Sequence, residues 1–276
     1  MKKLSLFCII IACFWACDTI EGPYYQAIPT DIVEAEFETL DPSKVYRKIL
    51  FEEYTGHICV NCPEAHERLA ELHHAWGDTL VPIAVHAGAF ATVSAMYPED
   101  FTTPEGKEWA NYFNISTNPR AVVNRQLYGT SYDVQLINWP NAINAVDRSY
   151  IAAAIQLVPT ERYNKLKANV KVSVLENISA PVQLSIVLIE DNIISPQSTP
   201  AGRDTTYVHN HVLRAVFNGT FGTRLTEDGY LVKDESYEVA YTLDWKNKWV
   251  KENCSIVAFL INKETDEVIQ VEHTKL

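Results

Sequence analysis

Two cysteines with two residues between them, Cys59 and Cys62, are the residues of this chain whose type and spacing most directly suggest chemistry. An apolar run ending in a glycine precedes them, and a helix-like segment follows. A cysteine pair at this spacing can act as a reactive thiol pair, supply half of a metal site, or close a structural disulfide. The surrounding sequence favours one of these three kinds of site over the others.

The position of the pair at the start of a helix favours a reactive thiol. Cys59 falls at or just before the first turn, where unpaired backbone N–H groups and the helix dipole stabilise a thiolate. Such a position lowers the pKa of a cysteine from about 8.5 to roughly 3.5–7.5. Cys62 lies almost one turn later, close enough to close a disulfide. We therefore predict that Cys59 is the attacking thiol, that Cys62 resolves the mixed disulfide, and that both sulfur atoms are exposed at the tip of a sheet.

Metal binding is the main chemical alternative. His57, Cys59, Cys62 and His66 lie close together in the sequence, and Cys62 and His66 share a helix face at i, i+4. Two thiolates and two imidazoles would suit zinc or copper. Structural zinc sites, however, usually draw their ligands from two separated pairs. His66 is more simply explained as a residue on the solvent-exposed face of an amphipathic helix. The thiol pair is therefore the leading prediction, with no metal and no cofactor, and the four-residue metal set stays as an alternative.

The elements expected around the pair alternate between strands and helices over residues 45–156. Apolar positions at helical spacing predict a helix that begins at Cys62, and these positions are Ala65, Leu69, Leu72 and Trp76. The other predicted elements are strands over 47–54, 79–88 and 120–126 and helices over 104–113 and 138–155. Strands alternating with helices predict an α/β sheet that is covered on both faces.

From residue 157 the pattern changes to short alternating strands. Apolar side chains alternate with polar ones in three segments, which are 167–174, 181–188 and 237–245. Such strands predict an antiparallel β-sandwich domain over residues 157–276, following the α/β domain. Cys254 enters one of these strands and is expected to be an inert, buried thiol.

The N-terminus indicates export to the bacterial envelope. Two lysines precede an apolar stretch, Leu4–Trp15, whose 12 residues are fewer than the roughly 20 needed for a spanning helix. The stretch is followed by a small residue and a cysteine, which resembles the lipobox of bacterial lipoproteins. The resemblance implies a signal peptide over 1–16 and a lipid on Cys17 that anchors the protein in the membrane. Cys13 fits the same box but leaves a very short apolar region.

Composition after the signal limits the partners. Residues 17–44 are acidic, contain three prolines and show little periodicity, so we predict a stalk or linker between the lipid and the first domain. Removing the signal leaves 21 basic and 35 acidic residues. This charge balance argues against nucleic acid and anionic lipid surfaces as partners, because both bind a basic face.

Two further features near the cysteine pair resemble the thioredoxin fold. Glu53, six residues before Cys59, occupies the place of the buried acid that serves thioredoxins in proton transfer. The segment "NISTNPRAVVN" resembles the loop that ends in a cis proline, faces the cysteine pair and binds the substrate backbone. The resemblance implies a thioredoxin-like domain over 45–156, in which Glu53 assists proton transfer and Asn118 and Pro119 line the substrate groove.

The chain departs from the thioredoxin pattern at several positions. Ile58 stands where thioredoxins have tryptophan, Val60 and Asn61 replace a Gly-Pro dipeptide, and the buried acid is glutamate rather than aspartate. Residues 87–108 look like an insertion between the second strand and the next helix. These differences leave the redox potential and the direction of the reaction open.

The chain as a whole resembles the 28-kilodalton outer-membrane-protein family of Bacteroidetes-type bacteria. A lipobox, a thioredoxin-like unit and a β-sandwich that contains "YVHNHVLRAVFNGTFG" carry this resemblance, which covers nearly the full length. It implies a lipoprotein of the bacterial outer membrane. We expect thiol–disulfide exchange with the thiols or disulfides of an envelope protein. The alternative is a non-catalytic binding or adhesion protein, with segments 209–219 and 244–249 as its candidate contact loops.

Overall fold

The computed structural model describes residue 32 and residues 35–276. The predicted signal peptide, Cys17 and most of the predicted stalk lie outside the described residues. Among the residues that are described, no helix is both long enough and apolar enough to cross a membrane.

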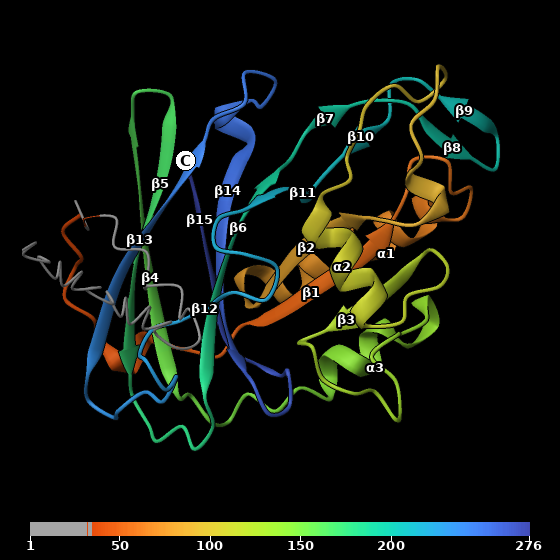
Figure 1. Ribbon diagram of the computed structural model, residues 1–276. Helices are drawn as coiled ribbons and strands as arrows, with labels where there is room; N and C mark the ends of the chain where they lie inside the picture. Colours follow the sequence, from red (N-terminus) through yellow and green to blue (C-terminus); the bar gives the residue numbers. More distant parts are fainter. Residues whose placement is uncertain (1–31, 33–34) are drawn as a thin grey trace, which may run out of the picture.

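The described chain is mixed α/β, with far more strand than helix (Figure 1). The helices are α1 (Cys62–Trp76), α2 (Pro104–Tyr112) and α3 (Trp139–Asn144). The strands are β1 (Ile49–Thr55), β2 (Leu80–His86), β3 (Arg120–Val123), β4 (Ala153–Arg162), β5 (Lys165–Val174), β6 (Val182–Glu190), β7 (Ile193–Ile194), β8 (Gln197–Thr199), β9 (Gly202–Asp204), β10 (Val208–His209), β11 (Val212–Val216), β12 (Thr223–Arg224), β13 (Ser236–Asp244), β14 (Cys254–Asn262) and β15 (Val268–Lys275).

One sheet of eight strands runs through the molecule (Figure 1). Its order is β15-β14-β6-β11-β2-β1-β3, and β12 also pairs with β6. β1 is parallel to β2 and antiparallel to β3, whereas β14 is antiparallel to both β6 and β15. Strands from the two halves of the chain meet where Val212 of β11 pairs with Ala84 of β2. The sheet is therefore continuous from the CxxC region to the C-terminal strands.

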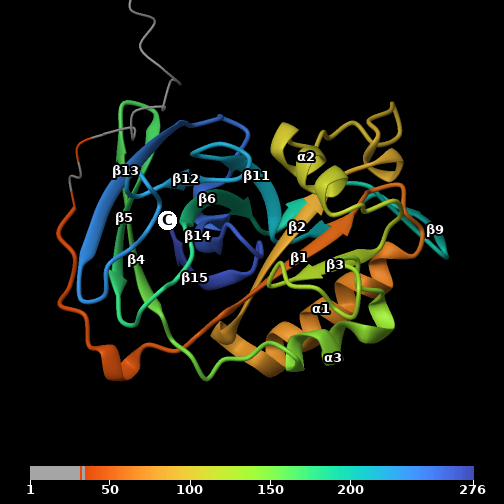
Figure 2. The same ribbon diagram turned by 60° about the horizontal axis from the view of Figure 1, so that its bottom comes forward.

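A second sheet of three strands, β13-β5-β4, packs on the β6 and β14 end of the large sheet (Figure 2). Side chains from both sheets form one buried cluster, which includes Val170 and Val172 of β5 and Ile186 of β6. Because alternate residues of a strand point to the same face, β5 presents a single apolar row to the large sheet. This is the alternation that the sequence predicts over 167–174.

The helices lie at the other end of the large sheet, with α2 on one face and α1 and α3 on the opposite face (Figure 2). Successive side chains of β1 point to opposite faces. Phe51 therefore lies in one buried cluster with Leu69 of α1 and Trp139 of α3, whereas Leu50 lies in another with Trp109 of α2. Every residue of β1 and β2 is buried, as a sheet covered on both faces requires.

The predicted helix over 138–155 is much shorter than expected. α3 ends at Asn144, and Ala153 already begins β4. A turn interrupts the helical pattern, because the carboxylate of Asp147 accepts hydrogen bonds from the backbone N–H and the hydroxyl of Ser149. The apolar residues at the end of the predicted helix therefore join a strand instead.

The predicted strand over 120–126 is also shorter than expected. β3 ends at Val123, and Asn124 and Arg125 take the left-handed conformation with φ of 52° and 48°. After this turn the Arg125 side chain lies in the interior, where its Nη2 and Nε atoms donate to the two carboxylate oxygens of Glu52 at 2.6 and 2.9 Å. A buried ion pair therefore stands where the pattern predicts the end of a strand.

Candidate functional site

Both cysteines lie where the chain passes from β1 into α1. The loop 56–61 leaves the carboxyl end of β1, and α1 begins at Cys62. Cys59 stands just before the first turn, as predicted, and forms a disulfide with Cys62. The structure therefore holds the pair in its oxidised form, at the edge of the sheet to which the carboxyl ends of β1 and β2 point.

The prediction that the two sulfur atoms are exposed is wrong. Only 2% of Cys59 and 0% of Cys62 are exposed. Two segments close over the pair, and we call them the cover: residues 89–97, which follow β2, and residues 197–204, which form the β8–β9 hairpin (Figure 1). The hydroxyl groups of Tyr97 and Ser198 lie 2.7 Å apart and join the two segments. The cover explains the burial, because a strand-to-helix junction alone would leave this tip open.

Backbone hydrogen bonds fix the cover to the CxxC loop. The N–H of Ile58 donates to the carbonyl of Phe90 at 3.0 Å, and the N–H of Ser198 donates to the carbonyl of His57 at 2.8 Å. The buried side-chain amide of Gln197 donates to the carbonyl of Cys59 at 2.9 Å. Sequence reasoning identified the insertion 87–108 but missed Gln197, because no motif marks the hairpin that carries it.

Pro119 lies at the same edge of the sheet as the cysteine pair. The predicted cis peptide bond between Asn118 and Pro119 is present. Arg120 pairs with Tyr54 in the β1–β3 ladder, so Pro119 lies next to the end of β1 from which the CxxC loop departs. The side-chain amide of Asn118 donates to the carbonyl of Ala87 at 3.2 Å and ties this loop to the end of β2.

Glu53 is a buried carboxyl group on the face of β1 that meets α1. Only 1% of the residue is exposed, and its Oε1 atom has no hydrogen-bond partner. Burial raises the pKa of Glu53 to about 8, because the charged form would lose its hydration without a compensating partner. Glu53 therefore holds a proton at neutral pH, which is the state that a proton donor needs.

His66 lies beside Glu53, one helical turn after Cys62. Its Nε2 atom is 3.4 Å from Oε1 of Glu53 and 2.8 Å from the hydroxyl of Thr55. Its Nδ1 atom is 2.7 Å from the hydroxyl of Tyr207. Burial is the main cause that lowers the pKa of His66 to about 3, so its imidazole is neutral at pH 7.

The alternative metal set is not brought together as a cluster of free ligands. The two sulfur atoms are bonded to each other, Nε2 of His57 lies 2.9 Å from the carbonyl of Thr92, and both nitrogens of His66 have hydrogen-bond partners. Among residue 32 and residues 35–276, no group of three or more His, Cys, Asp or Glu side chains is placed to hold a metal ion.

A small cavity of about 50 Å³ is lined by Glu53 and His66, and its lining also includes His86, His209 and His211. Both ring nitrogens of His86 and the Nδ1 atom of His209 are buried without a hydrogen-bond partner. Burial lowers the pKa of His86 well below its usual value and that of His209 to about 4. Sequence reasoning missed this cluster, because its histidines come from α1, β2 and the segment around β10.

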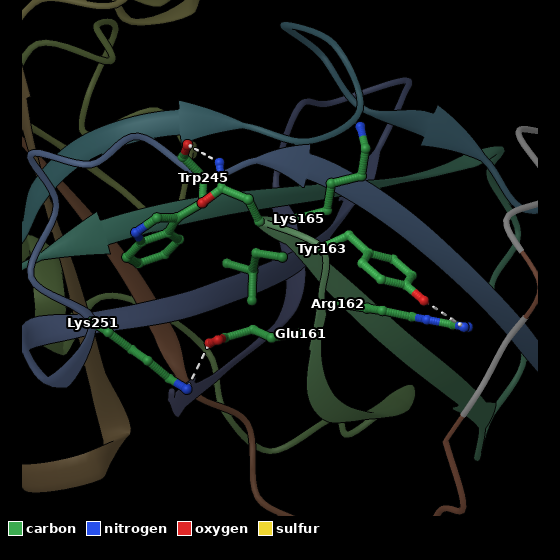
Figure 3. Close-up of a pocket in the computed structure, with 8 residues that line it drawn as sticks. Glu161, Arg162, Tyr163, Lys165, Trp245 and Lys251 are labelled. Carbon is green, nitrogen blue, oxygen red and sulfur yellow. Dashed lines mark hydrogen bonds and ion pairs between the residues drawn. The ribbon is translucent and has the colours of Figure 1, made fainter.

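The candidate contact loops of the binding alternative have different environments. Segment 209–219 contains β11 and is part of the large sheet. In segment 244–249, Trp249 is buried in the core between the two sheets, whereas Trp245 lines a cavity of about 280 Å³. Figure 3 shows Tyr163, Lys165 and Lys251 around the same cavity, at the turn between β4 and β5. The free thiol of Cys254 is buried, as predicted, and burial raises its pKa to about 12.

Replacing Gly56 with alanine is expected to displace the cover. A Cβ atom at this position would lie 2.4 Å from the backbone carbon and oxygen of Phe90 and 2.8 Å from the backbone nitrogen of Ala91. The turn must move to accommodate it, at a typical overpacking cost of about 1–3 kcal/mol. We expect dithiothreitol to reduce the disulfide of Gly56→Ala protein several times faster than that of wild type, as measured by alkylation and mass spectrometry.

A second glycine provides the control for general destabilisation. A Cβ atom on Gly106 would lie 2.9 Å from Cγ1 of Val85, so Gly106→Ala crowds the core below α2 rather than the cover. Equal acceleration of reduction in the two variants would contradict a protective role for the cover.

Comparisons with known proteins agree with this architecture. The family model described as outer membrane protein Omp28 matches residues 106–276, a region that begins after the CxxC segment. The solved structure of HBP35 of Porphyromonas gingivalis is similar over 84% of this chain and 76% of its own, with 17% identity and a TM-score of 0.64. A protein from Agrobacterium tumefaciens is similar over 84% of this chain and 98% of its own, with 12% identity and a TM-score of 0.50.

A domain of the outer membrane lipoprotein Omp28 from Porphyromonas gingivalis also matches, with 29% identity over 45% of this chain and 88% of that domain and a TM-score of 0.33. No curated protein gave a significant match. The family match spans more than half of the sequence, which is sufficient to assign membership. The chain belongs to the Omp28 family of outer membrane proteins of the bacterial cell envelope.

Proposed function

We propose that this protein is a lipid-anchored thiol–disulfide exchange protein of the bacterial envelope. Cys17 carries the lipid, residues 17–44 form the stalk, residues 45–156 are a thioredoxin-like domain, and residues 157–276 are a β-sandwich domain. The observation that carries the proposal is the disulfide at the start of α1, with the buried acid Glu53 on the preceding strand β1 and Pro119 on the same sheet edge. Its partners are thiols or disulfides of other envelope proteins.

The reaction needs only the side chains of the two proteins. A thiolate of the partner attacks the sulfur of Cys59, and the Cys59–Cys62 bond breaks with its electron pair going to Cys62, which takes a proton from Glu53. A second thiolate of the partner then attacks the mixed disulfide and releases Cys59, so the partner is oxidised and the pair is reduced. The reverse sequence reduces a partner disulfide, and the two potentials decide the direction. Asn118 and Pro119 line the groove in which the partner backbone lies.

The cover has to open before the partner can react, because only 2% of Cys59 is exposed. The hydrogen bonds that hold the cover join two surface segments, and local opening of such segments needs far less free energy than global unfolding. Exchange is therefore expected to be slow with small thiols and faster with a partner that stabilises the open form.

Cysteine variants test the proposal directly. The oxidised protein is mixed under native conditions with a peptide that carries two thiols, and mixed disulfides are followed by mass spectrometry. We expect the dithiol peptide to reduce wild type. With the same peptide in its disulfide form, Cys59 of the Cys62→Ser variant attacks the peptide disulfide and should accumulate as a mixed disulfide, whereas Cys59→Ser should give none. Cys254→Ser is the matched control. It should react like wild type, because Cys254 is a buried free cysteine that lies far from the CxxC in the sequence. Reduction of wild type only after denaturation would exclude the catalytic proposal.

A second candidate function is non-catalytic binding at the cell surface, and the burial of both sulfur atoms favours it. In that case the disulfide only stabilises the CxxC loop, and the cavity near Trp245, Tyr163 and Lys165 is a candidate contact surface (Figure 3). This function predicts that the Cys59→Ser/Cys62→Ser double variant keeps its binding while losing some stability. The exchange proposal predicts that the same variant loses all transfer to the dithiol peptide.

A further inference from the structure

Glu53 is enclosed and needs a route to water if it is to give up a proton more than once. The titratable groups that surround it come from three elements: His66 from α1, His86 from β2, and His209 and His211 from the segment around β10. Each reduction of the Cys59–Cys62 disulfide would remove the proton of Glu53. A buried carboxylate would then remain next to neutral imidazoles, at a high cost in solvation free energy.

Among these groups, His66 lies beside Glu53 on one side and forms a hydrogen-bond contact that leads toward the surface on the other. Its Nε2 atom lies 3.4 Å from Oε1 of Glu53, and its Nδ1 atom lies 2.7 Å from the hydroxyl of Tyr207. Tyr207 is half-buried, stands directly before β10, and is flanked by the exposed residues Thr206 and Val208. Its hydroxyl is therefore placed between the histidine cluster and the outer surface.

His86 and His209 offer no comparable route, and the polar contact of His211 is with Asp191, 3.1 Å from its Nδ1 atom, rather than with Glu53. His86 has no hydrogen-bond partner at either ring nitrogen. His209 lies 3.2 Å from the carbonyl of Ser195 through Nε2, and its Nδ1 atom has no partner. The hydroxyl of Thr55, 2.8 Å from Nε2 of His66, holds the imidazole ring in the orientation that faces Glu53.

We propose that His66 and Tyr207 form a proton relay that connects Glu53 with solvent during reduction of the Cys59–Cys62 disulfide. The inference rests on the proposed exchange function and adds two residues to it, one of them from the second half of the chain. Glu53 is the proton donor to the sulfur of Cys62, and His66 and Tyr207 act through Glu53.

The relay keeps the number of protons on each of its side chains constant. After Glu53 has protonated the thiolate of Cys62, Nε2–H of His66 donates its proton to the Glu53 carboxylate. The Nδ1 atom takes a proton from the hydroxyl of Tyr207, which receives one from water in the same step and leaves hydroxide in the solvent, so neither ring carries a net charge. The N–H of His66 has then moved from Nε2 to Nδ1, and the ring returns to the Nε2–H tautomer before the next turnover. The neutral imidazole that burial favours at pH 7, with one N–H and one free nitrogen, is the form that this transfer requires.

A tyrosine pair in the chain provides a matched test. Tyr207→Phe removes only the hydroxyl that contacts His66, whereas Tyr97→Phe removes a hydroxyl that contacts Ser198 in the cover and has no link to Glu53. Reduction by dithiothreitol is measured on the full mature chain, in the range where its rate rises in proportion to reductant concentration. The chemical step is then part of the measured rate.

We expect Tyr207→Phe to lower the rate of disulfide reduction about tenfold at pH 7. This factor is smaller than the one that general acid–base catalysis usually contributes to a rate. Added imidazole buffer is expected to restore much of the rate, because a soluble proton carrier can replace the missing hydroxyl. In a Glu53→Gln background the same substitution is expected to have no further effect, since Tyr207 acts through Glu53. Tyr97→Phe is expected to show neither the tenfold loss nor the rescue.

Three results would overturn the relay. Equal rates for Tyr207→Phe and wild type, with wild type readily reduced, would remove the relay and leave the exchange function intact. A loss that persists unchanged in the Glu53→Gln background and is not rescued by buffer would assign Tyr207 a purely structural role. A wild-type protein that dithiothreitol cannot reduce under native conditions would remove the exchange function and the relay together.

Discussion

Replacing Arg125 with methionine lowers the free energy of unfolding by about 3–5 kcal/mol, because it leaves a buried carboxylate without its partner. The side chains of Arg125 and Glu52 are only 2% and 0% exposed, and the guanidinium donates two hydrogen bonds to the carboxylate. The rings of Trp109, Phe113 and Phe259 lie 4.8 to 5.3 Å from the Cζ atom of Arg125. The two phenylalanine rings have no hydrogen-bond donor, and the indole N–H of Trp109 already donates to the carbonyl of Thr220, so these rings do not replace the lost arginine.

A double variant separates two effects on the free energy of unfolding: the cost of leaving Glu52 without its partner, and the net contribution of the Glu52–Arg125 ion pair. Glu52→Leu/Arg125→Met removes both charges and is expected to recover most of the lost stability, because two apolar side chains suit this surrounding. Lys165→Met is the control: its ion pair with Asp244 is 55% and 82% exposed, and such pairs contribute at most about 1 kcal/mol. Urea unfolding with the disulfide intact gives all three values. An Arg125→Met protein as stable as Lys165→Met protein would contradict the prediction.

The parts of the site that follow from local pattern could be predicted from the sequence. Apolar spacing predicted a helix that begins at Cys62, and the helix begins there. The buried position of Glu53 and the cis bond before Pro119 were implied by resemblance to thioredoxins, and both are present. These features depend on a few neighbouring residues, so one sequence is enough to reveal them.

The parts that depend on distant residues could not be predicted. Gln197 donates to the carbonyl of Cys59 across 138 residues of sequence, and no sequence motif in either segment indicates this contact. Arg125 lies in what the pattern describes as a strand, 73 residues from its partner Glu52. The exposure of Cys59 was predicted wrongly for the same reason, because the cover that buries it comes from two distant segments. Hydrophobic periodicity reports which face of an element is buried and not which segment buries it.

Acid is expected to destabilise this protein steeply because of its buried histidines. Burial lowers the pKa values of His66 to about 3 and of His209 to about 4, and it lowers that of His86 well below its usual range. In the unfolded chain a histidine takes up a proton near pH 6.5, whereas these three cannot do so while folded. Their contribution to stability is therefore complete above pH 6.5 and is lost as the pH falls. Each contributes about 1.4 kcal/mol per pH unit in that range.

Glu53 has the opposite effect on the stability of the folded protein. Its folded pKa of about 8 lies above the usual value of 4.5, so its contribution is complete below pH 4.5 and is lost as the pH rises to 8. Between pH 4.5 and 6.5, these three histidines oppose one carboxyl group and together give a slope of about 2–3 kcal/mol per pH unit toward instability in acid. The lowered pKa values of His73 and His273 act in the same direction. Above pH 6.5 the slope reverses. The free energy of unfolding is therefore expected to reach its maximum near pH 6.5.

Urea unfolding of the oxidised protein at intervals from pH 5 to pH 8 measures both slopes. His86→Leu removes one titrating ring and should reduce the acid slope by about 1.4 kcal/mol per unit, whatever its effect on stability at pH 7. His74→Leu is the control, since this exposed histidine on α1 should leave the slope unchanged. Glu53→Gln should abolish the decline between pH 6.5 and 8. An acid slope that is the same in His86→Leu and wild type would mean that His86 is already protonated in the folded state, because only a ring that stays neutral on folding can link stability to pH in this way.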